Sequence, residues 1–197
     1  MLPLKAASNV KLFVGLGNPG PEYKETRHNV GVWWLDRLAH FLNVSFSEES
    51  NWRLLLAKAE YEGQRIFLAR PLTYMNESGH PVRALTSYYR INPKDMVIAH
   101  DELDLSPGTI KLKMNGGHAG HNGLKSVIAH LGTSDFWRLR IGIGHPGHKD
   151  KVVSWVLGKP AEKDRLLIED AIECSGVFFP ELLRGDMNQF MQHLHTS

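Results

Sequence analysis

The 197-residue sequence contains a single cysteine, Cys174, which excludes an internal disulfide framework. Such scarcity is typical of proteins from reducing compartments. The sequence also lacks any apolar run near the roughly 20 residues that a membrane span requires. Residues 1–9 do not contain the long apolar core of a secretory signal. We therefore expect a cytoplasmic protein with a short N-terminal extension at 1–9 and one domain from 10 to 197.

Neither sign of charge dominates, since 23 Lys and Arg face 21 Asp and Glu, a formal net charge of +2. This mildly basic balance permits an anionic partner, but it also serves solubility alone. Hydrophobic residues make up 42% of the chain, an ordinary value for a globular protein. A chain of this length can bury a sizeable core as a single domain.

Several catalytic signatures are missing. There is no Gly-x-Ser-x-Gly elbow, and Cys174 lies in a helical pattern that favours a core thiol over a nucleophile. Residues 15–20 formally match the Gly-x-Gly-x-x-Gly dinucleotide fingerprint. That fingerprint needs a helix opening within the glycines, whereas Pro19 and Pro21 delay any helix to about Asn29. A nicotinamide cofactor is therefore not expected.

Strand-like apolar runs alternate with helical periodicity along the chain. Glu62-Gly63 separates two of the strand-like runs and predicts a hairpin, which favours a mixed sheet. We predict a single-domain three-layer α/β/α sandwich around a twisted, mixed, mostly parallel sheet. The predicted strands are 12–16, 53–61, 64–69, 96–99, 109–114 and 137–143, and the predicted helices are 34–42 (after an Asn29 cap), 81–89, 124–131, 161–183 and 186–193, with 152–157 ambiguous.

Polar residues gather in the loops that follow these strands, at 17–28, 71–78, 100–104 and 115–123. Ligands of open α/β sheets bind at the carboxyl ends of strands, so these loops could form one cleft.

In that cleft, His28 is placed to take a proton from water, because neutral imidazole has a pKa of about 6.5. A nearby Asp101 would fix its tautomer and stabilise the imidazolium, although Asp101 also suits a local turn cap. The amides of Asn18, Asn76 and Asn122 could bind an ester or peptide, or simply form turns.

Two further patterns have open interpretations. His118 and His121, with Asp101, suggest a metal site, but a glycine-rich loop is a poor scaffold for three ligands. The basic side chains of Lys111 and Lys113 alternate along one strand, and those of Arg138 and Arg140 along another. They favour either a phosphate clamp or a solvated charged edge.

Five motifs together closely resemble the signature of bacterial peptidyl-tRNA hydrolase. They occur in the family's order and cover roughly residues 11–160. The few departures, such as Gly17 where other members can carry Ala, replace no chemical group. The motifs are Gly-Leu-Gly-Asn-Pro-Gly with Tyr23 and Thr-Arg-His-Asn at 15–31, Pro-x-Thr-Tyr-Met-Asn-x-Ser-Gly at 71–79, His-Asp-Glu-Leu-Asp at 100–104, Gly-Gly-His-x-Gly-His-Asn-Gly-Leu-Lys at 116–125 and Arg-Leu-Arg-Ile-Gly-Ile-Gly-His-Pro at 138–146.

The resemblance implies a monomeric enzyme, independent of metal and organic cofactor, that cleaves the ester between a peptide and the 3′ ribose of tRNA. It implies that His28 is the general base activating water, with Asp101 orienting and polarising it. Asn18 would sense the N-blocked peptide. The other residues implied are Tyr23, Tyr74, Asn76 and Asn122, lining the site for peptide and tRNA 3′ end, Met75 as an apolar wall, and Lys113 and Arg140 gripping the 5′-phosphate.

Elementary chemistry agrees with this implication. An ester has a far better leaving group than an amide, so one oriented water and a His–Asp pair suffice, and general-base help contributes about 10²- to 10⁴-fold. Phosphate contacts carry no sequence information, which suits an enzyme that accepts every tRNA. A metal-dependent hydrolase and a non-catalytic RNA-binding protein are the alternatives.

Overall fold

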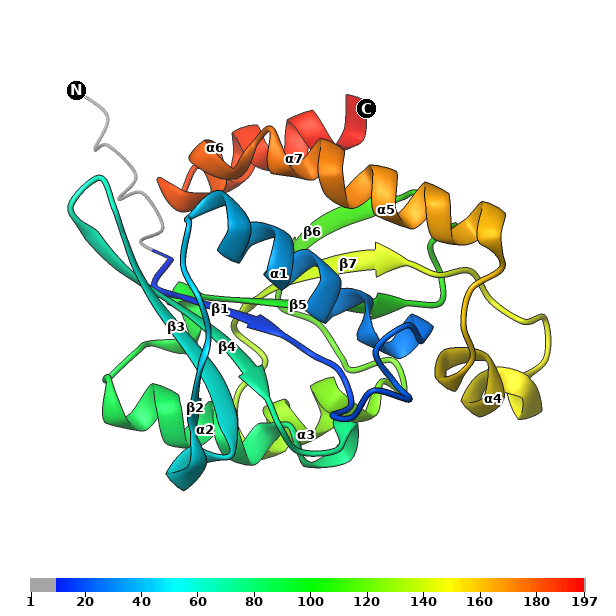
Figure 1. Cartoon of the computed structure of the whole chain (residues 1–197), viewed down its shortest axis with the longest axis horizontal. Helices are drawn as coiled ribbons and strands as arrows, with labels where there is room; N and C mark the ends of the chain where they lie inside the picture. The colour runs from blue at the N-terminus through cyan, green and yellow to red at the C-terminus, as the bar shows by residue number, and fades with distance from the viewer. Residues whose placement is uncertain (1–9, 197) are drawn as a thin grey trace.

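The computed structural model describes residues 10–196, which form a seven-stranded sheet covered by helices on both faces (Figure 1). The strand order is β2-β3-β4-β1-β5-β7-β6. The expected mixed α/β sandwich is confirmed, with parallel pairings in the centre and antiparallel ones toward both edges. The strands are β1 (Leu12–Gly15), β2 (Ser47–Glu49), β3 (Leu54–Tyr61), β4 (Gln64–Pro71), β5 (Met96–Glu102), β6 (Ile110–Met114) and β7 (Trp137–Gly142).

Two helical layers follow from the two faces of the central strands. Along β1, Phe13 packs into one hydrophobic cluster while Leu12 and Val14 pack into the other, because successive strand side chains point to opposite faces. Helices α1, α5, α6 and α7 cover the Phe13 face, and α2 and α3 cover the opposite face (Figure 1). The helices are α1 (Val30–Phe41), α2 (Gly79–Tyr88), α3 (Asn122–Leu131), α4 (Val152–Leu157), α5 (Glu162–Gly176), α6 (Phe179–Leu183) and α7 (Met187–Thr196).

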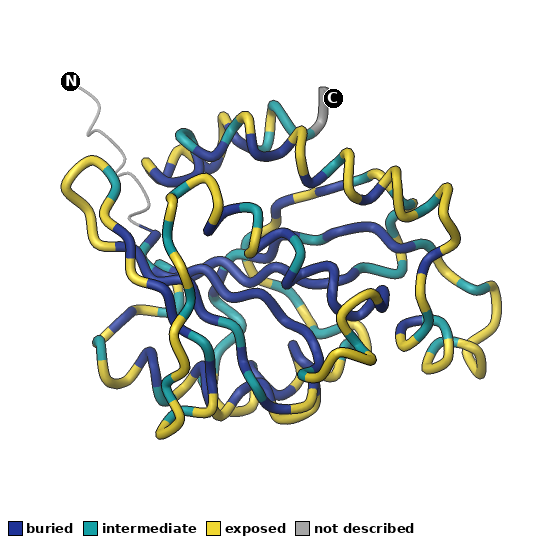
Figure 2. The backbone as a smooth tube through the Cα atoms, viewed as in Figure 1, coloured by how far each residue is buried: buried dark blue, intermediate teal, exposed yellow. Residues whose placement is uncertain are grey.

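The central strands are buried along their length, while exposed residues concentrate on the outer sides of the helices and in the loops (Figure 2). Within residues 10–196, no helix has both the length and the apolarity that crossing a membrane would require. The extension expected at 1–9 lies outside the described residues, and the proposed domain boundary stays a prediction.

The predicted hairpin is present as β3 and β4, and its turn residues Glu62 and Gly63 have φ values of 49° and 79°. Two positive φ angles are characteristic of the tight turn that matches the twist of paired strands. The helix predicted over 161–183 is instead interrupted after Gly176, and α6 begins with Pro180 in its first turn. Proline lacks an amide hydrogen and is tolerated at a helix start, so it favours a new helix there.

The structure settles one ambiguity and adds three corrections. The stretch at 152–157, which periodicity left ambiguous, is helical, as α4, whereas the short polar edge strand β2 was not predicted. Cys174 is exposed on α5, so it is not a core thiol. Strand β5 continues beyond the predicted 96–99 to Glu102, which places Asp101 on a rigid strand and not in a loop.

Close packing brings the start of α1 over the strand ends. A Cβ added at Gly31 would lie 2.3 Å from the carbonyl oxygen of Ala99 on β5, and one at Gly15 would lie 2.7 Å from the carbonyl oxygen of Gly31. Only glycine permits backbones to approach so closely. The segment just before α1, the 3₁₀ turn η1 (Arg27–Asn29), is thereby held beside the carboxyl end of β5.

Candidate active site

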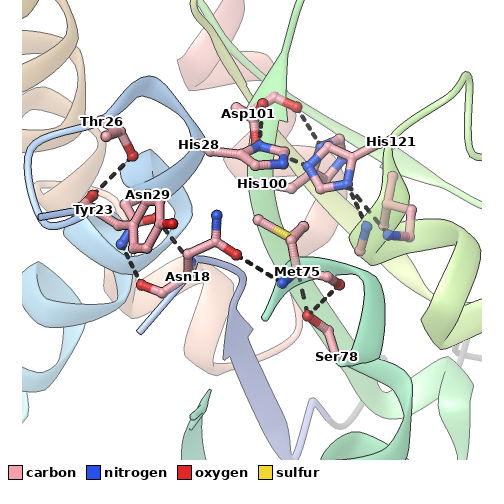
Figure 3. A network of polar contacts seen from close by, with 12 residues as sticks. Asn18, Tyr23, Thr26, His28, Asn29, Met75, Ser78, His100, Asp101 and His121 are labelled. Atoms are coloured by element: carbon pink, nitrogen blue, oxygen red, sulfur yellow. Dashed lines mark hydrogen bonds and ion pairs between the residues drawn. The ribbon is translucent and has the colours of Figure 1, made fainter. Parts of the chain in front are cut away.

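The site centres on Asp101, a buried carboxylate near the end of β5 that contacts two histidines from distant parts of the chain (Figure 3). The Nδ1 atom of His28, in η1, lies 2.9 Å from both Asp101 oxygens. The Nε2 atom of His121, just before α3, lies 2.8 Å from Asp101 Oδ1. The expected pairing of His28 with Asp101 is therefore present, and the loops at 17–28 and 115–123 do meet the end of β5.

The backbone of α3 fixes the tautomer of His121. Its Nδ1 accepts hydrogen bonds from the amides of Gly123, at 3.1 Å, and Leu124, at 3.3 Å. A nitrogen that accepts cannot carry the ring hydrogen, so the hydrogen resides on Nε2 and is donated to Asp101. These two amides are among the unpaired donors that begin every helix, and His121 acts as their cap.

His28 has the complementary arrangement. The ionised carboxylate of Asp101 only accepts hydrogen bonds, so His28 donates through Nδ1–H and its Nε2 keeps a free lone pair. Burial by itself lowers the pKa of His28, but the charge and hydrogen bond of Asp101 outweigh it, and the pKa is raised above 6.5. Burial would raise the pKa of Asp101, yet the two histidines hold it well below 3.8. The pair can therefore accept a proton at His28 while Asp101 stays ionised.

Asn18 is held rigidly beside this pair. Its backbone N–H donates to Asn29 Oδ1 and its carbonyl accepts from Asn29 Nδ2, both at 2.9 Å. Its side-chain Oδ1 accepts the backbone N–H of Met75 at 2.7 Å. The remaining Nδ2 group has no acceptor among the described residues and points toward the side where His28 lies (Figure 3). The site thus offers one oriented amide donor.

Asn29 has a different role from the one expected. It was predicted to cap α1 through its side chain, but that side chain makes no cap hydrogen bond and clamps Asn18 instead. Only 1% of Asn29 is exposed. A buried carboxamide satisfies both a donor and an acceptor of the neighbouring loop, a use that capping preferences do not reveal.

The other predicted lining residues surround this centre. Tyr23 and Tyr74 pack edge to face, with ring centroids 6.2 Å apart, and Tyr74 is 55% exposed. Met75 is buried, and a Cβ on Gly123 would lie 2.5 Å from its sulfur, so Met75 packs against the start of α3. Asn76 follows Met75 and Asn122 follows His121, and both are exposed. These two residues are neighbours of site residues in the sequence, and within residues 10–196 neither forms a hydrogen bond with the His28–Asp101 pair.

The basic strands divide into two kinds of residue. Lys113 is exposed and lies opposite Arg138, while Arg140 forms an ion pair with Glu102 at 2.9 Å. Arg138 is only 4% exposed and donates to the carbonyl groups of Gly116 and Gly117. Arg138 therefore holds the glycine-rich loop and is not available to a phosphate, whereas Lys113 and Arg140 remain candidates.

The predicted metal set is not assembled. His118 Nδ1 accepts the amide of Gly120 at 3.1 Å. Among residues 10–196, the three groups with potential ligand atoms within 4.8 Å of one another are His28, Asp101 and His121. This trio fits a metal poorly, because metal-bound histidine normally donates its other ring hydrogen to an acceptor. The Nδ1 of His121 faces two amide donors instead, so Nε2 could bind a metal only as an imidazolate or with that cap lost.

Sequence reasoning missed the contact of His121 with Asp101 and the clamp formed by Asn29. The sequence pattern indicates His121 only as a metal candidate and Asn29 only as a helix cap. Each lies beside a predicted site residue, His121 before Asn122 and Asn29 after His28. A run of consecutive polar residues at a strand–helix junction was the available signal, but it does not say which side chain faces inward.

Comparison with known proteins agrees with this geometry. The sequence model of the peptidyl-tRNA hydrolase family matches residues 12–197. A peptidyl-tRNA hydrolase of Delftia acidovorans is 52% identical over 188 residues, covering 95% of this chain and 91% of that protein. One from Coxiella burnetii is 50% identical over 190 residues, covering 96% of this chain and 100% of that protein.

A solved structure is similar over almost the whole fold. The crystal structure of peptidyl-tRNA hydrolase from Acinetobacter baumannii superposes with a TM-score of 0.92 at 41% identity, covering 97% of each chain. The sequence relatives and this structure therefore agree with the resemblance carried by the five motifs. The chain belongs to the peptidyl-tRNA hydrolase family.

Proposed function

We propose that this protein hydrolyses the ester bond between a peptide and the 3′ ribose of tRNA, releasing both. Family membership over nearly the whole chain supports the reaction. The observation that carries the chemistry is the 2.9 Å contact of His28 Nδ1 with Asp101, which leaves Nε2 of His28 free as a base. This combination favours a catalyst over an RNA-binding module without turnover.

In the proposed reaction, a water molecule attacks the ester carbonyl carbon while His28 Nε2 takes one of its protons. The imidazolium that forms is stabilised by ionised Asp101, which His121 also holds in place. The tetrahedral intermediate then collapses with cleavage of the carbon–oxygen bond to the ribose. The departing 3′ oxygen takes the proton from His28, which restores the base.

The amide donors supply recognition. The Nδ2 group of Asn18 suits a carbonyl oxygen of the substrate, either of the reacting ester or of the peptide's blocking group. We propose that this contact favours N-blocked aminoacyl groups over free amines. Tyr23, Tyr74 and Met75 would form the wall of the peptide site, with Asn76 and Asn122 as exposed donors toward the 3′ end of tRNA.

Lys113 and Arg140 would bind the 5′-phosphate of the tRNA. Lys113 is exposed on β6, and Arg140 lies on the adjacent strand β7, so both can contribute positive charge at one edge of the sheet. Arg140 is also oriented by Glu102. Contacts to phosphate are independent of sequence and strengthen binding to any tRNA.

We further propose that the enzyme acts in the cytoplasm, where peptidyl-tRNA arises, and as a monomer, because His28, Asp101 and His121 come from one chain. The step requires neither a metal nor an organic cofactor, since the ribose oxygen of an ester is a far better leaving group than the amine of an amide. The tautomer of His121 also argues against the metal-dependent alternative.

The test is the release of N-acetyl-aminoacyl groups from tRNA. Wild-type protein should turn over many equivalents, and His28→Ala should lose about 10²- to 10⁴-fold in kcat, the usual contribution of a general base. His40→Ala, which removes an exposed histidine of α1, is the matched control and should retain full activity. An unimpaired His28→Ala enzyme, or tRNA binding without turnover in the wild type, would refute the proposal.

A further inference from the structure

The three residues of η1 each bind a different part of the fold. Arg27, His28 and Asn29 are 5%, 8% and 1% exposed. Asn29 clamps the loop after β1, and His28 contacts Asp101 of β5. Arg27 points to neither of these and contacts α4 and the residues that follow it. The position of the catalytic histidine is therefore defined by three separate attachments.

The attachment through Arg27 consists of four contacts. Its Nη1 donates to the carbonyl groups of Trp155, at 3.2 Å, and Lys159, at 3.0 Å. Its guanidinium carbon lies 3.6 Å from the ring centre of Trp155. Its backbone N–H donates to the carbonyl of Gly158 at 3.0 Å. The side chain and the main chain of Arg27 thus both bind the segment 155–159.

These contacts suit an arginine in particular. The carbonyl of Trp155 in the last turn of α4 already accepts the amide of Gly158 at 3.2 Å, and Arg27 adds a charged donor to it, while the carbonyl of Lys159 lies just beyond the helix. A planar guanidinium can donate to two carbonyl groups while stacking on an indole, which a lysine ammonium cannot do. Trp155 is itself fixed, because its Nε1 donates to the carbonyl of Gly144 at 2.9 Å in the loop after β7.

We propose that Arg27 is a positioning residue that couples α4 to the general base, acting through His28 and not on the substrate. The loop after β7 positions Trp155 through Gly144, and Trp155 and Lys159 position Arg27. Arg27 in turn keeps the adjacent residue, His28, beside Asp101. This inference rests on the proposed function, because it assigns Arg27 a part in the hydrolysis carried out by His28.

The variants Arg27→Met and Arg27→Lys test this coupling. Arg27→Met should lower kcat for N-acetyl-aminoacyl-tRNA by about 10- to 100-fold with KM changed less than about twofold, since a misplacement near 1 Å can cost about 10²-fold. Arg27→Lys should recover part of this loss. Arg184→Met, which removes a guanidinium paired with Glu62 at the surface, is the control and should match the wild type.

The second readout is the dependence on Asp101. If Arg27 acts by holding His28 against Asp101, then adding Arg27→Met to the Asp101→Asn variant should lower kcat by less than about threefold. The midpoint of the kcat/KM pH profile should also fall in Arg27→Met and stay unchanged in Arg184→Met. The proposal would be overturned if Arg27→Met lowered kcat by the same factor in the wild type and in Asp101→Asn. It would also be overturned if Arg27→Met changed KM alone.

Folding is checked by thermal unfolding of each variant. Should Arg27→Met fail to fold, Arg27→Lys and Trp155→Leu provide the same comparison. Each removes some of the contacts between residue 27 and residues 155–159 and keeps the others. An inactive wild type would contradict the proposed hydrolysis itself. An active wild type with fully active Arg27 and Trp155 variants would contradict only the positioning role.

Discussion

Replacing Asp101 with asparagine removes one charge and turns one hydrogen-bond acceptor into a donor, with almost no change in shape. His121 dictates how the new amide must lie. Its Nδ1 is occupied by two backbone amides, so its Nε2–H must keep an acceptor, and the asparagine oxygen has to face it. The amide nitrogen then takes the position of Oδ2, which is 2.9 Å from His28 Nδ1.

The asparagine oxygen at the Oδ1 position also lies 2.9 Å from His28 Nδ1, but it already accepts from His121, and the amide nitrogen at the Oδ2 position now donates toward the same Nδ1. This added donor favours the tautomer in which Nδ1 accepts and the ring hydrogen lies on Nε2. The atom that should take a proton from water is then already protonated. In the productive tautomer, the asparagine N–H₂ group and the Nδ1–H group of His28 are two donors facing each other, which costs about 1–3 kcal/mol. Loss of the carboxylate also removes about 4 kcal/mol of imidazolium stabilisation, for charges about 4 Å apart at an effective dielectric constant of 20.

Together these effects come to about 5–7 kcal/mol, which at about tenfold per 1.4 kcal/mol exceeds the roughly 10²- to 10⁴-fold that a general base contributes. The account therefore predicts that kcat falls by that whole contribution, about 10²- to 10⁴-fold. The assay is single-turnover release of N-acetyl-aminoacyl groups from tRNA at saturating enzyme, which isolates the chemical step from binding. Asp104→Asn, an exposed carboxylate three residues away, is the matched control and should stay within twofold. An Asp101→Asn enzyme within tenfold of the wild type would refute the assigned roles of Asp101 and His28.

Three further predictions follow from the same geometry. The kcat/KM of the wild type should rise with pH through a midpoint above 6.5, because the raised pKa of His28 keeps the base protonated and inactive below it; a rate flat from pH 5 to 9 would contradict this. Asn29→Ala should destabilise the fold by about 2–6 kcal/mol in urea unfolding, because two buried backbone groups of Asn18 lose their partners at about 1–3 kcal/mol each, and a change below about 0.5 kcal/mol would count against the clamp. Lys113→Gln should weaken tRNA binding and reduce the slope of log affinity against log salt by about one, whereas an unchanged slope would remove Lys113 from the phosphate site.

Much of the fold was predictable because central strands bury both faces. Leu12, Phe13 and Val14 form a continuous apolar run that has few other interpretations. The hairpin was equally clear from Glu62-Gly63, whose backbone angles need residues that accept positive φ. Sequence patterns failed to predict the edge strand β2, because its short run of polar residues gives no periodic signal.

The site residues likewise divide into those that the sequence could predict and those that it could not. Motif and chemistry together identified His28 and Asp101, and the structure joins them. Local sequence could not reveal that Arg138 faces inward, because Arg138 and Arg140 alternate on one strand face and look equivalent. Their difference arises from the glycine-rich loop, whose carbonyl groups surround only Arg138. Long-range partners of this kind depend on tertiary packing, which periodicity does not record.

The central claim is that His28 carries its hydrogen on Nδ1 and offers Nε2 as the base. Nitrogen NMR of the protein labelled in its histidine rings measures this directly, with the His28 signals assigned by their loss in His28→Gln. Above the pKa of His28, the account predicts a protonated Nδ1 and an unprotonated Nε2 in the wild type. A neutral ring with its hydrogen on Nε2 would contradict it.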